Sequence, residues 1–171
     1  SDHPGTAAHY RFNEANWNGT PGEVADSTNT NHGTGLNGAN TEEDLFGRYG
    51  SFDGINDMVE VPNSSKLQIV KDLTLSFWYR KVAGAGGYVI EKNAGGEYAI
   101  YQHPNGYLYY YHGGLAGGGS QAQWPNILTP TELTAGLWHH VVVTREKSTR
   151  TLKVYLGGAF TVVGNQSRSR I

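Results

Sequence analysis

The sequence predicts an all-β protein, built as an antiparallel β-sandwich or jelly roll. Two long stretches, 72–81 and 137–145, alternate apolar and polar side chains with the period of two that is typical of strands. With these two, the chain contains about eleven such segments, most of them short, at fairly regular spacing and separated by glycine-rich turns. The 11 tyrosines and 4 tryptophans, against a single methionine, favour strands over helices. Strand spacing by itself does not distinguish a sandwich from a jelly roll.

The stretch 72–81 is expected to be a core strand with one buried face. One parity is apolar and consists of Leu73, Leu75, Phe77 and Tyr79. The other parity consists of Thr74, Ser76, Trp78 and Arg80. Because arginine resists burial, we expect Leu75 and Phe77 to face the core and Trp78 to face outward. The valine run within 137–145 suits a strand in the middle of a sheet.

The remaining strands are shorter. We expect them at 7–12, 31–37, 48–52, 57–61, 88–92, 97–103, 107–112, 150–156 and 159–163. The polar segment 13–31 is expected to be a long loop, and loops of this length in compact domains are usually functional or tied down by a ligand. Only 131–135 could hold one turn of helix.

Length and charge bound the class of protein. At 171 residues the chain is expected to form one domain, with a core that needs no disulfides, and it contains no cysteine. The net charge is -2, from 13 basic and 15 acidic residues, and no basic cluster occurs. We therefore expect neither nucleic acid nor an anionic membrane surface as a partner. No apolar run approaches the roughly 18 residues needed to span a bilayer.

Five blocks of the chain resemble a known family. The first block is His9-Tyr10-Arg11-Phe12-Asn13-Glu14, followed by Asp26-Ser27 and Asn31-His32-Gly33-Thr34. The second is Ser51-Phe52-Asp53-Gly54 with Met58-Val59-Glu60-Val61-Pro62, and the third is Leu73-Thr74-Leu75-Ser76-Phe77-Trp78. The last two are Leu137-Trp138-His139-His140-Val141-Val142-Val143-Thr144 and Thr151-Leu152-Lys153-Val154-Tyr155-Leu156-Gly157-Gly158. In order and spacing these blocks, over residues 8–160, resemble a laminin-G-like domain of the concanavalin A-like lectin/glucanase superfamily.

The resemblance carries expectations about the whole chain. It implies a single laminin-G-like jelly-roll domain over residues 1–171. The opening block, with Trp17-Asn18-Gly19-Thr20 inside it, further resembles laminin-G-like regions of large surface proteins from bacterial mannose-sensitive haemagglutinin pilus loci. The family usually continues past Tyr155 with two more strands, which would here be missing, supplied by another chain, or replaced by a shorter variant. A missing strand would leave an open edge at 7–12, where we expect a dimer or a complementing chain to pair.

The resemblance also implies a metal site. Several members of the family hold a calcium ion near the opening loop, and Asp26 and Asn31 occupy the matching segment. Calcium takes six to eight oxygen ligands at loosely specified angles, which a loop rich in Asp and Asn provides. The alternative is that Asp26 caps a turn through its own backbone. Calcium is the one cofactor that the sequence suggests.

Catalysis is not expected. Hydrolases of the superfamily place paired carboxylates on one strand, because glycoside hydrolysis needs two carboxyl groups that flank the scissile bond. The only acidic cluster is Glu42-Glu43-Asp44, which we predict to be a solvated turn in a loop. His139 and His140 are adjacent on a strand, so they point to opposite faces and do not chelate one ion.

A tyrosine-rich hairpin is the strongest candidate for a binding site. With a three-residue turn at Pro104-Asn105-Gly106, and Gly106 at positive φ, Ile100 and Leu108 share one face with Tyr98 and Tyr110. The opposite face, called here the tyrosine face, then carries Tyr101, His103, Tyr107, Tyr109 and Tyr111. Such rings can stack on sugar faces while their hydroxyls form hydrogen bonds. Alternatively, these tyrosines simply suit a half-buried pleated surface.

These observations predict a non-catalytic binding or adhesion module of an extracellular or bacterial cell-surface protein. We expect a carbohydrate ligand. The main alternative is a structural or protein–protein interaction module within a larger cell-surface or pilus-associated protein, and a glycan hydrolase or lyase is a weaker one.

Overall fold

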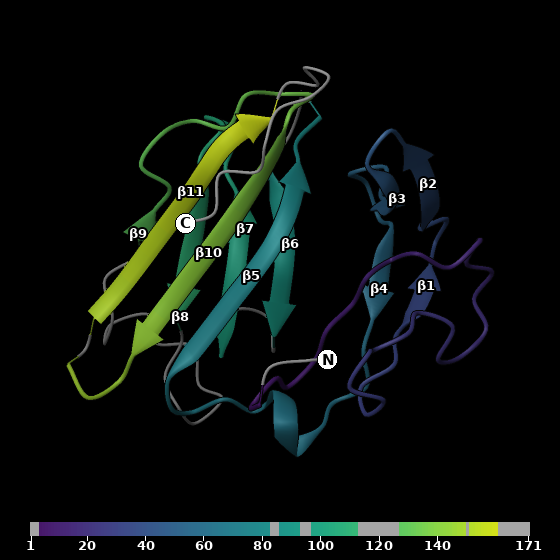
Figure 1. The fold of residues 1–171 in the computed structure, drawn as a ribbon, viewed down its shortest axis with the longest axis horizontal. Helices are drawn as coiled ribbons and strands as arrows, with labels where there is room; N and C mark the ends of the chain where they lie inside the picture. Colours follow the sequence, from purple (N-terminus) through teal and green to yellow (C-terminus); the bar gives the residue numbers. More distant parts are fainter. Residues whose placement is uncertain (1–3, 83–85, 93–96, 113–126, 150, 161–171) are drawn as a thin grey trace. The chain divides into compact units, whose positions relative to one another are not determined.

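The computed structural model describes residues 4–82, 86–92, 97–112, 127–149 and 151–160. The chain divides into two compact units, an N-terminal unit (Ser1–Gln68) and a C-terminal unit (Ile69–Ile171), whose strands Figure 1 labels. Among the described residues the only helical segment is a single 3-10 turn, η1 (Ser65–Leu67). No helix in that part of the chain is long and apolar enough to span a bilayer.

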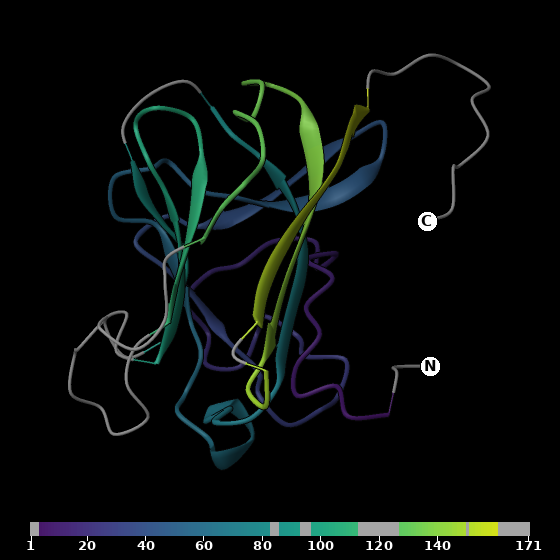
Figure 2. The same ribbon diagram turned by 90° about the vertical axis from the view of Figure 1, so that its left-hand side faces the viewer.

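The C-terminal unit is a sandwich of two antiparallel sheets. The first sheet has the order β11-β10-β5, with β5 (Leu73–Arg80), β10 (Trp138–Glu146) and β11 (Thr151–Phe160). The second has the order β6-β7-β8-β9, with β6 (Gly87–Lys92), β7 (Tyr98–Gln102), β8 (Leu108–His112) and β9 (Ile127–Leu128). Figure 2 shows the two sheets as separate layers. The predicted fold class, an all-β antiparallel sandwich of the jelly-roll type, is confirmed.

The two longest predicted strands form the centre of the first sheet. β10 pairs with β5 from Trp138↔Arg80 to Arg145↔Leu73, and β11 pairs on its other side. β10 is therefore the central strand, as its valine run predicts. Along β5, Leu75 and Phe77 pack against the core, whereas Trp78 is 53% exposed. The predicted orientation of β5 is confirmed.

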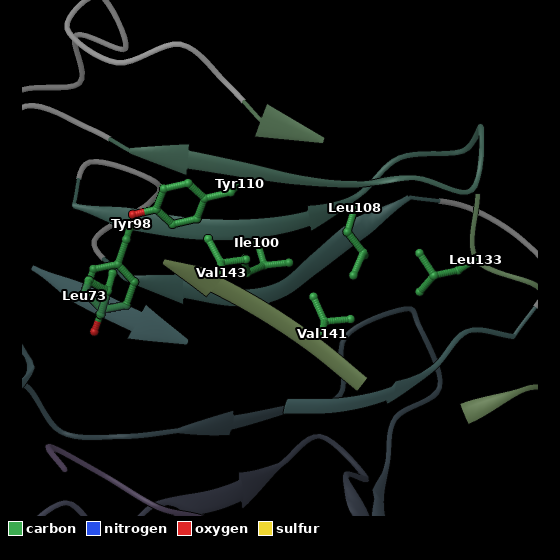
Figure 3. Packing of buried hydrophobic residues seen from close by; sticks show 8 residues of the cluster. All are labelled: Leu73, Tyr98, Ile100, Leu108, Tyr110, Leu133, Val141 and Val143. Carbon is green, nitrogen blue, oxygen red and sulfur yellow. The ribbon is translucent and has the colours of Figure 1, made fainter. Parts of the chain in front are cut away.

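The core of the sandwich lies between these sheets (Figure 3). Its buried members are Leu73, Tyr98, Ile100, Leu108, Tyr110, Leu133, Val141 and Val143. Arg145 is also buried, because it shares the inward parity of Val141 and Val143 on β10. Its guanidinium donates from Nη2 to the carbonyl of Ile69 at 2.6 Å and from Nε to that of Lys71 at 3.0 Å. These bonds fasten the chain that leads into β5 onto the end of β10.

The N-terminal unit has two small antiparallel sheets and a core of its own. β1 (Thr34–Leu36) pairs with β4 (Met58–Glu60), and β2 (Asn40–Asp44) pairs with β3 (Gly47–Ser51). The buried residues are Trp17, Val24 and Ala39, with Tyr10, Phe12 and Val59 packed against them. The strands predicted at 31–37 and 57–61 are confirmed with shorter bounds, and the strand predicted at 48–52 is confirmed but begins and ends one residue earlier.

The strand predicted at 7–12 is wrong. This segment has a single bridge, between Tyr10 and Asp26, and Phe12 adopts φ 53, which ends an extended run. Its main chain is bonded to the opening loop instead, since His9 O accepts from Ser27 N at 2.8 Å and Ala7 O from Asn31 Nδ2 at 2.8 Å. Because residues 7–12 are not a strand, they offer no open edge to the complementing chain that we expected there. The expectation of a partner chain otherwise stays a prediction.

Three further expectations differ from the structure. Glu42, Glu43 and Asp44 lie on β2 rather than in a loop, and β2 lacks an apolar alternation that would reveal it. Residues 131–135 form no helix. β11 runs unbroken where two strands were predicted, because a bulge opposite Trp138 and His140 absorbs one extra residue. Residues 161–163 of the last predicted strand lie outside the described residues.

Two adjacent aromatic residues on β5 provide a matched test of this packing. Phe77→Ala removes a ring that packs against the core and should lower the free energy of unfolding by about 3 kcal/mol. Trp78→Ala removes an exposed ring and should lower it by less than about 1 kcal/mol. Urea unfolding of both variants measures the difference, and a larger loss for Trp78→Ala would mean that the strand faces the other way.

Candidate functional site

The hairpin between β7 and β8 has the predicted register. Tyr101 pairs with Tyr109, Ala99 with Tyr111, and Gln102 with Leu108. His103 N donates to Tyr107 O at 2.9 Å, which leaves Pro104, Asn105 and Gly106 as a three-residue turn. Ile100 and Leu108 consequently lie together in the core.

Gly106 fixes that turn. Its φ is +88°, a conformation that side chains disfavour, and a Cβ there would lie 2.5 Å from Glu132 Oε1 and 2.7 Å from Lys81 Nζ. Lys81 is buried, and its Nζ lies 3.7 Å from Glu132 Oε1. Leu133 N donates to Gly106 O at 3.0 Å, so the turn is held by contacts on both sides.

The tyrosine face is a connected group of rings. Tyr109 and Tyr111 are nearly parallel, with centroids 6.1 Å apart, and His103 lies 5.1 Å from Tyr109. Tyr101 meets Tyr111 edge to face at 6.4 Å. These contacts hold the rings in fixed orientations on the outward side of the sheet. Tyr107 lies on the same side beside the turn and, like the other four residues, is half-buried.

Sequence reasoning missed one member of this group. Tyr88 on β6 pairs with Tyr101, and their rings meet edge to face at 5.1 Å. It is 54% exposed and extends the ring surface toward the edge of the sheet. The alternation of β6 could have indicated which side Tyr88 faces, but only the pairing of β6 with β7 brings it beside Tyr101.

The face is largely uncharged and rich in hydroxyls. Burial, and then the neighbouring hydroxyls of Tyr109, Tyr88 and Tyr101, raise the pKa of Tyr111. That hydroxyl therefore stays protonated at physiological pH and can both donate and accept a hydrogen bond. Glu91, opposite Ala99, is the only Asp, Glu, Lys or Arg on this face among the described residues of β6, β7 and β8.

The candidate calcium residue Asp26 is surrounded by donors. Its Oδ1 accepts from His9 N at 2.8 Å and Thr28 N at 3.0 Å. Its Oδ2 accepts from Thr28 Oγ1 at 2.5 Å, Asn31 N at 2.9 Å and Thr30 N at 3.3 Å. Burial raises the pKa of Asp26, but these hydrogen bonds outweigh it and hold the pKa well below the usual range. The side chain caps its own turn, as the alternative reading from the sequence proposes.

Asn31 is engaged in the same way. Its Oδ1 accepts from Ser64 Oγ at 2.6 Å, and its Nδ2 donates to Ala7 O at 2.8 Å. Carboxylates of two other residues also bind main-chain N–H groups of the opening loop. Glu23 accepts from Asn18 N and Gly19 N, and Glu14 accepts from Ala25 N. The long loop is thus tied down by its own side chains.

This arrangement does not fit a calcium ion at Asp26 and Asn31. Calcium requires oxygens with lone pairs directed at the metal, whereas here five N–H or O–H donors already point at the Asp26 carboxylate. In the described part of the chain no three His, Cys, Asp or Glu side chains gather as a metal group. The calcium expectation stays a prediction.

The remaining candidate residues are separated by the fold. Glu42 accepts from Tyr49 Oη at 2.8 Å and from Ser51 Oγ at 2.9 Å, while Glu43 lies 3.5 Å from Arg48 on the opposite side of β2. His139 is buried in the C-terminal unit, and His140 on the outward side accepts from or donates to Ser76 Oγ at 3.0 Å. The predicted opposite orientation of the two histidines is confirmed.

Comparison with known proteins identifies one match. A laminin-G family model, described as the concanavalin A-like lectin/glucanases superfamily, matches residues 53–166. That match begins after the opening block, so Asp26 and Asn31 lie outside it. No curated protein and no solved structure matches the chain. The narrower resemblance to surface proteins of pilus loci stays a prediction.

The hydrogen bonds of Asp26 make a prediction about stability and pH. Asp26→Asn replaces an acceptor oxygen by an NH2 group that faces main-chain donors, so it should lower the free energy of unfolding by about 2 kcal/mol at pH 7. Because the folded pKa is depressed, the contribution is present above about pH 4 and is lost as the pH falls further. Urea unfolding between pH 3 and 7 should show a smaller pH dependence in the variant than in the wild type.

The same variant tests calcium. If Asp26 acts only within the loop, added calcium should leave the melting temperature of both proteins unchanged. A calcium-dependent rise in the wild type that Asp26→Asn abolishes would instead assign the ion to this loop.

Proposed function

Because the chain belongs to the concanavalin A-like lectin/glucanases superfamily, we propose that it is a non-catalytic saccharide-binding module and that its ligand binds on the tyrosine face. The superfamily membership supports a role as a binding module. The contacts among the rings on β7 and β8 support the location of the binding site.

The rings match what a sugar presents. A pyranose has a C–H face that stacks on an aromatic ring and a rim of hydroxyls that exchange hydrogen bonds. Tyr109 and Tyr111 present two nearly parallel rings, and their hydroxyls supply donors and acceptors. Since the rings already contact each other and His103, binding would cost little side-chain entropy.

The ligand that suits this face is an uncharged saccharide. The tyrosine face also carries the carboxylate of Glu91. This carboxylate would repel an acidic sugar, and it can accept hydrogen bonds from the hydroxyls of a neutral one. We also propose an extracellular or cell-surface location for the module.

The carboxylates support a binding role over hydrolysis. A glycosidase needs two carboxyl groups roughly 5–10 Å apart and directed at one bond. Within the described β6, β7 and β8, Glu91 is the only carboxylate on the tyrosine face, and Glu97, directly before β7, is paired with Lys92 Nζ at 3.4 Å. On β2, Glu42 and Glu43 are adjacent residues and point to opposite sides of the strand.

A protein-contact role is a second candidate, which the N-terminal unit favours. Leu45 and Phe46, in the turn between β2 and β3, are 85% and 61% exposed, and Ile55 is 86% exposed. Exposed apolar groups of this size often mark contact surfaces. Light scattering on the wild type and on Leu45→Ser/Phe46→Ser tests it: loss of self-association in the double variant would support this role.

Removing one ring of the tyrosine face tests the main proposal. A glycan array first identifies a neutral oligosaccharide that binds, and calorimetry then measures its affinity. Tyr109→Ala should weaken binding about tenfold, because it removes a ring that contacts both neighbours. Tyr109→Phe keeps the ring and should lose less.

The control is Trp78→Ala, which removes an exposed ring from the other sheet and should leave neutral-sugar binding unchanged. Near-ultraviolet circular dichroism checks that each variant is folded. Equal affinity in wild type and folded Tyr109→Ala would contradict the proposal.

A further inference from the structure

The outward side of the three-stranded sheet carries a second group of aromatic and basic side chains. The register of β5, β10 and β11 aligns them in rows, with Trp78 opposite His140 and Tyr155 opposite Val142. We call this group the Trp78 face, and it consists of Trp78, Arg80, Trp138, His140, Lys153 and Tyr155. It lies on the sheet opposite to the one that carries the tyrosine face.

The aromatic part of this face is both exposed and ordered. Trp78 and Tyr155 are 53% and 51% exposed. The rings of Trp78 and His140 lie 5.0 Å apart at 31°, and Ser76 Oγ is 3.0 Å from His140 Nε2. An exposed indole fixed beside a second ring is a surface on which a sugar can stack.

The position beside His140 on β11 is occupied by a glycine. Gly157 pairs with His140, and even a Cβ at Gly157 would lie 3.3 Å from the His140 Cβ. No side chain therefore stands next to the His140 ring on that strand. The next outward residue along β11 is Tyr155, so a ligand seated over Gly157 would meet an aromatic residue on either side.

The part of this face between the rows of Arg80 and Lys153 carries only positive charge. Arg80 lies over the ring of Trp138, with Cζ 5.0 Å from the centroid, and Lys153 is exposed on β11. The described outward positions between the rows of Arg80 and Lys153 carry no Asp or Glu, and Glu146 follows one row beyond Lys153, opposite Thr151. In a chain with a net charge of -2, this surface therefore concentrates positive charge.

The two cations are far apart. Arg80 and Lys153 lie in rows six residues apart along the strands, which corresponds to roughly 20 Å at the rise of an extended chain. That separation is longer than one sugar ring. A ligand that engages both cations and the rings between them must be an oligomer with repeated negative charges.

We propose that the Trp78 face binds an acidic oligosaccharide, such as a polyuronate, independently of the tyrosine face. Trp78 and His140 stack on the sugar rings, while Arg80 and Lys153 pair with their carboxylates. A guanidinium has paired N–H donors that suit a carboxylate, and that of Arg80 lies over the Trp138 ring.

A chemically matched pair of ligands tests this site on the full chain. Calorimetry with a hexamer of galacturonic acid and with its methyl ester, in 50 mM and 200 mM salt, compares two ligands that differ mainly in charge. We expect the free acid to bind and the ester to bind at least tenfold more weakly, with affinity for the acid falling as salt rises. Equal binding of acid and ester would overturn the proposal, as would equal binding of a hexaglutamate peptide, because charge alone would then suffice.

Five variants locate the site. Trp78→Ala should weaken binding of the acid about tenfold, and Trp78→Phe should retain most of it. Arg80→Gln should weaken it about fivefold, whereas the charge-matched control Lys66→Gln, in the N-terminal unit, should not. Tyr109→Ala should also leave it unchanged, so the two proposals fail separately. Unchanged affinity in folded Trp78→Ala, or loss in Tyr109→Ala, would refute the assignment.

Discussion

The turn at Gly106 determines which side of the second sheet carries the rings. A strand has a side-chain period of two, so a one-residue slip between β7 and β8 would move one strand's core residues outward and its tyrosines inward. Gly106 prevents this slip because its φ of +88° closes a three-residue turn. The ion pair of Lys81 and Glu132 lies where a Cβ would be, so the turn and the loop at 132–133 hold each other in place.

Local patterns predicted the parts of the fold that depend on nearest neighbours. The alternation of 72–81 indicated which side of β5 is buried, and the aliphatic residues Ile100 and Leu108 indicated the hairpin register. The errors arose where a distant contact decides the backbone. β2 is polar along its length and is a strand only because β3 pairs with it, while residues 7–12 bond to the opening loop through Asp26 and Asn31 instead of forming a ladder.

The candidate sites also divide into those that local sequence could predict and those that depend on distant contacts. The five residues of the tyrosine face lie on one hairpin, so their common orientation could be predicted from the sequence. Trp78, His140 and Tyr155 come from three strands, with more than 60 residues between the first two, and only the sheet register brings them together. The donors around Asp26 are largely main-chain N–H groups, whose directions no side-chain pattern reveals.

The tryptophans are distributed so that each unit has its own optical reporter. Trp17 is 4% exposed among the buried residues of the N-terminal unit, whereas Trp78 is 53% exposed in the C-terminal unit. A buried indole fluoresces at shorter wavelengths than an exposed one. Once Trp124, outside the described residues, and the half-buried Trp138 are replaced by phenylalanine, the blue edge of the emission in a urea titration follows mainly Trp17. Comparing that signal with circular dichroism of the strands reveals whether the two units unfold in one cooperative step or in two.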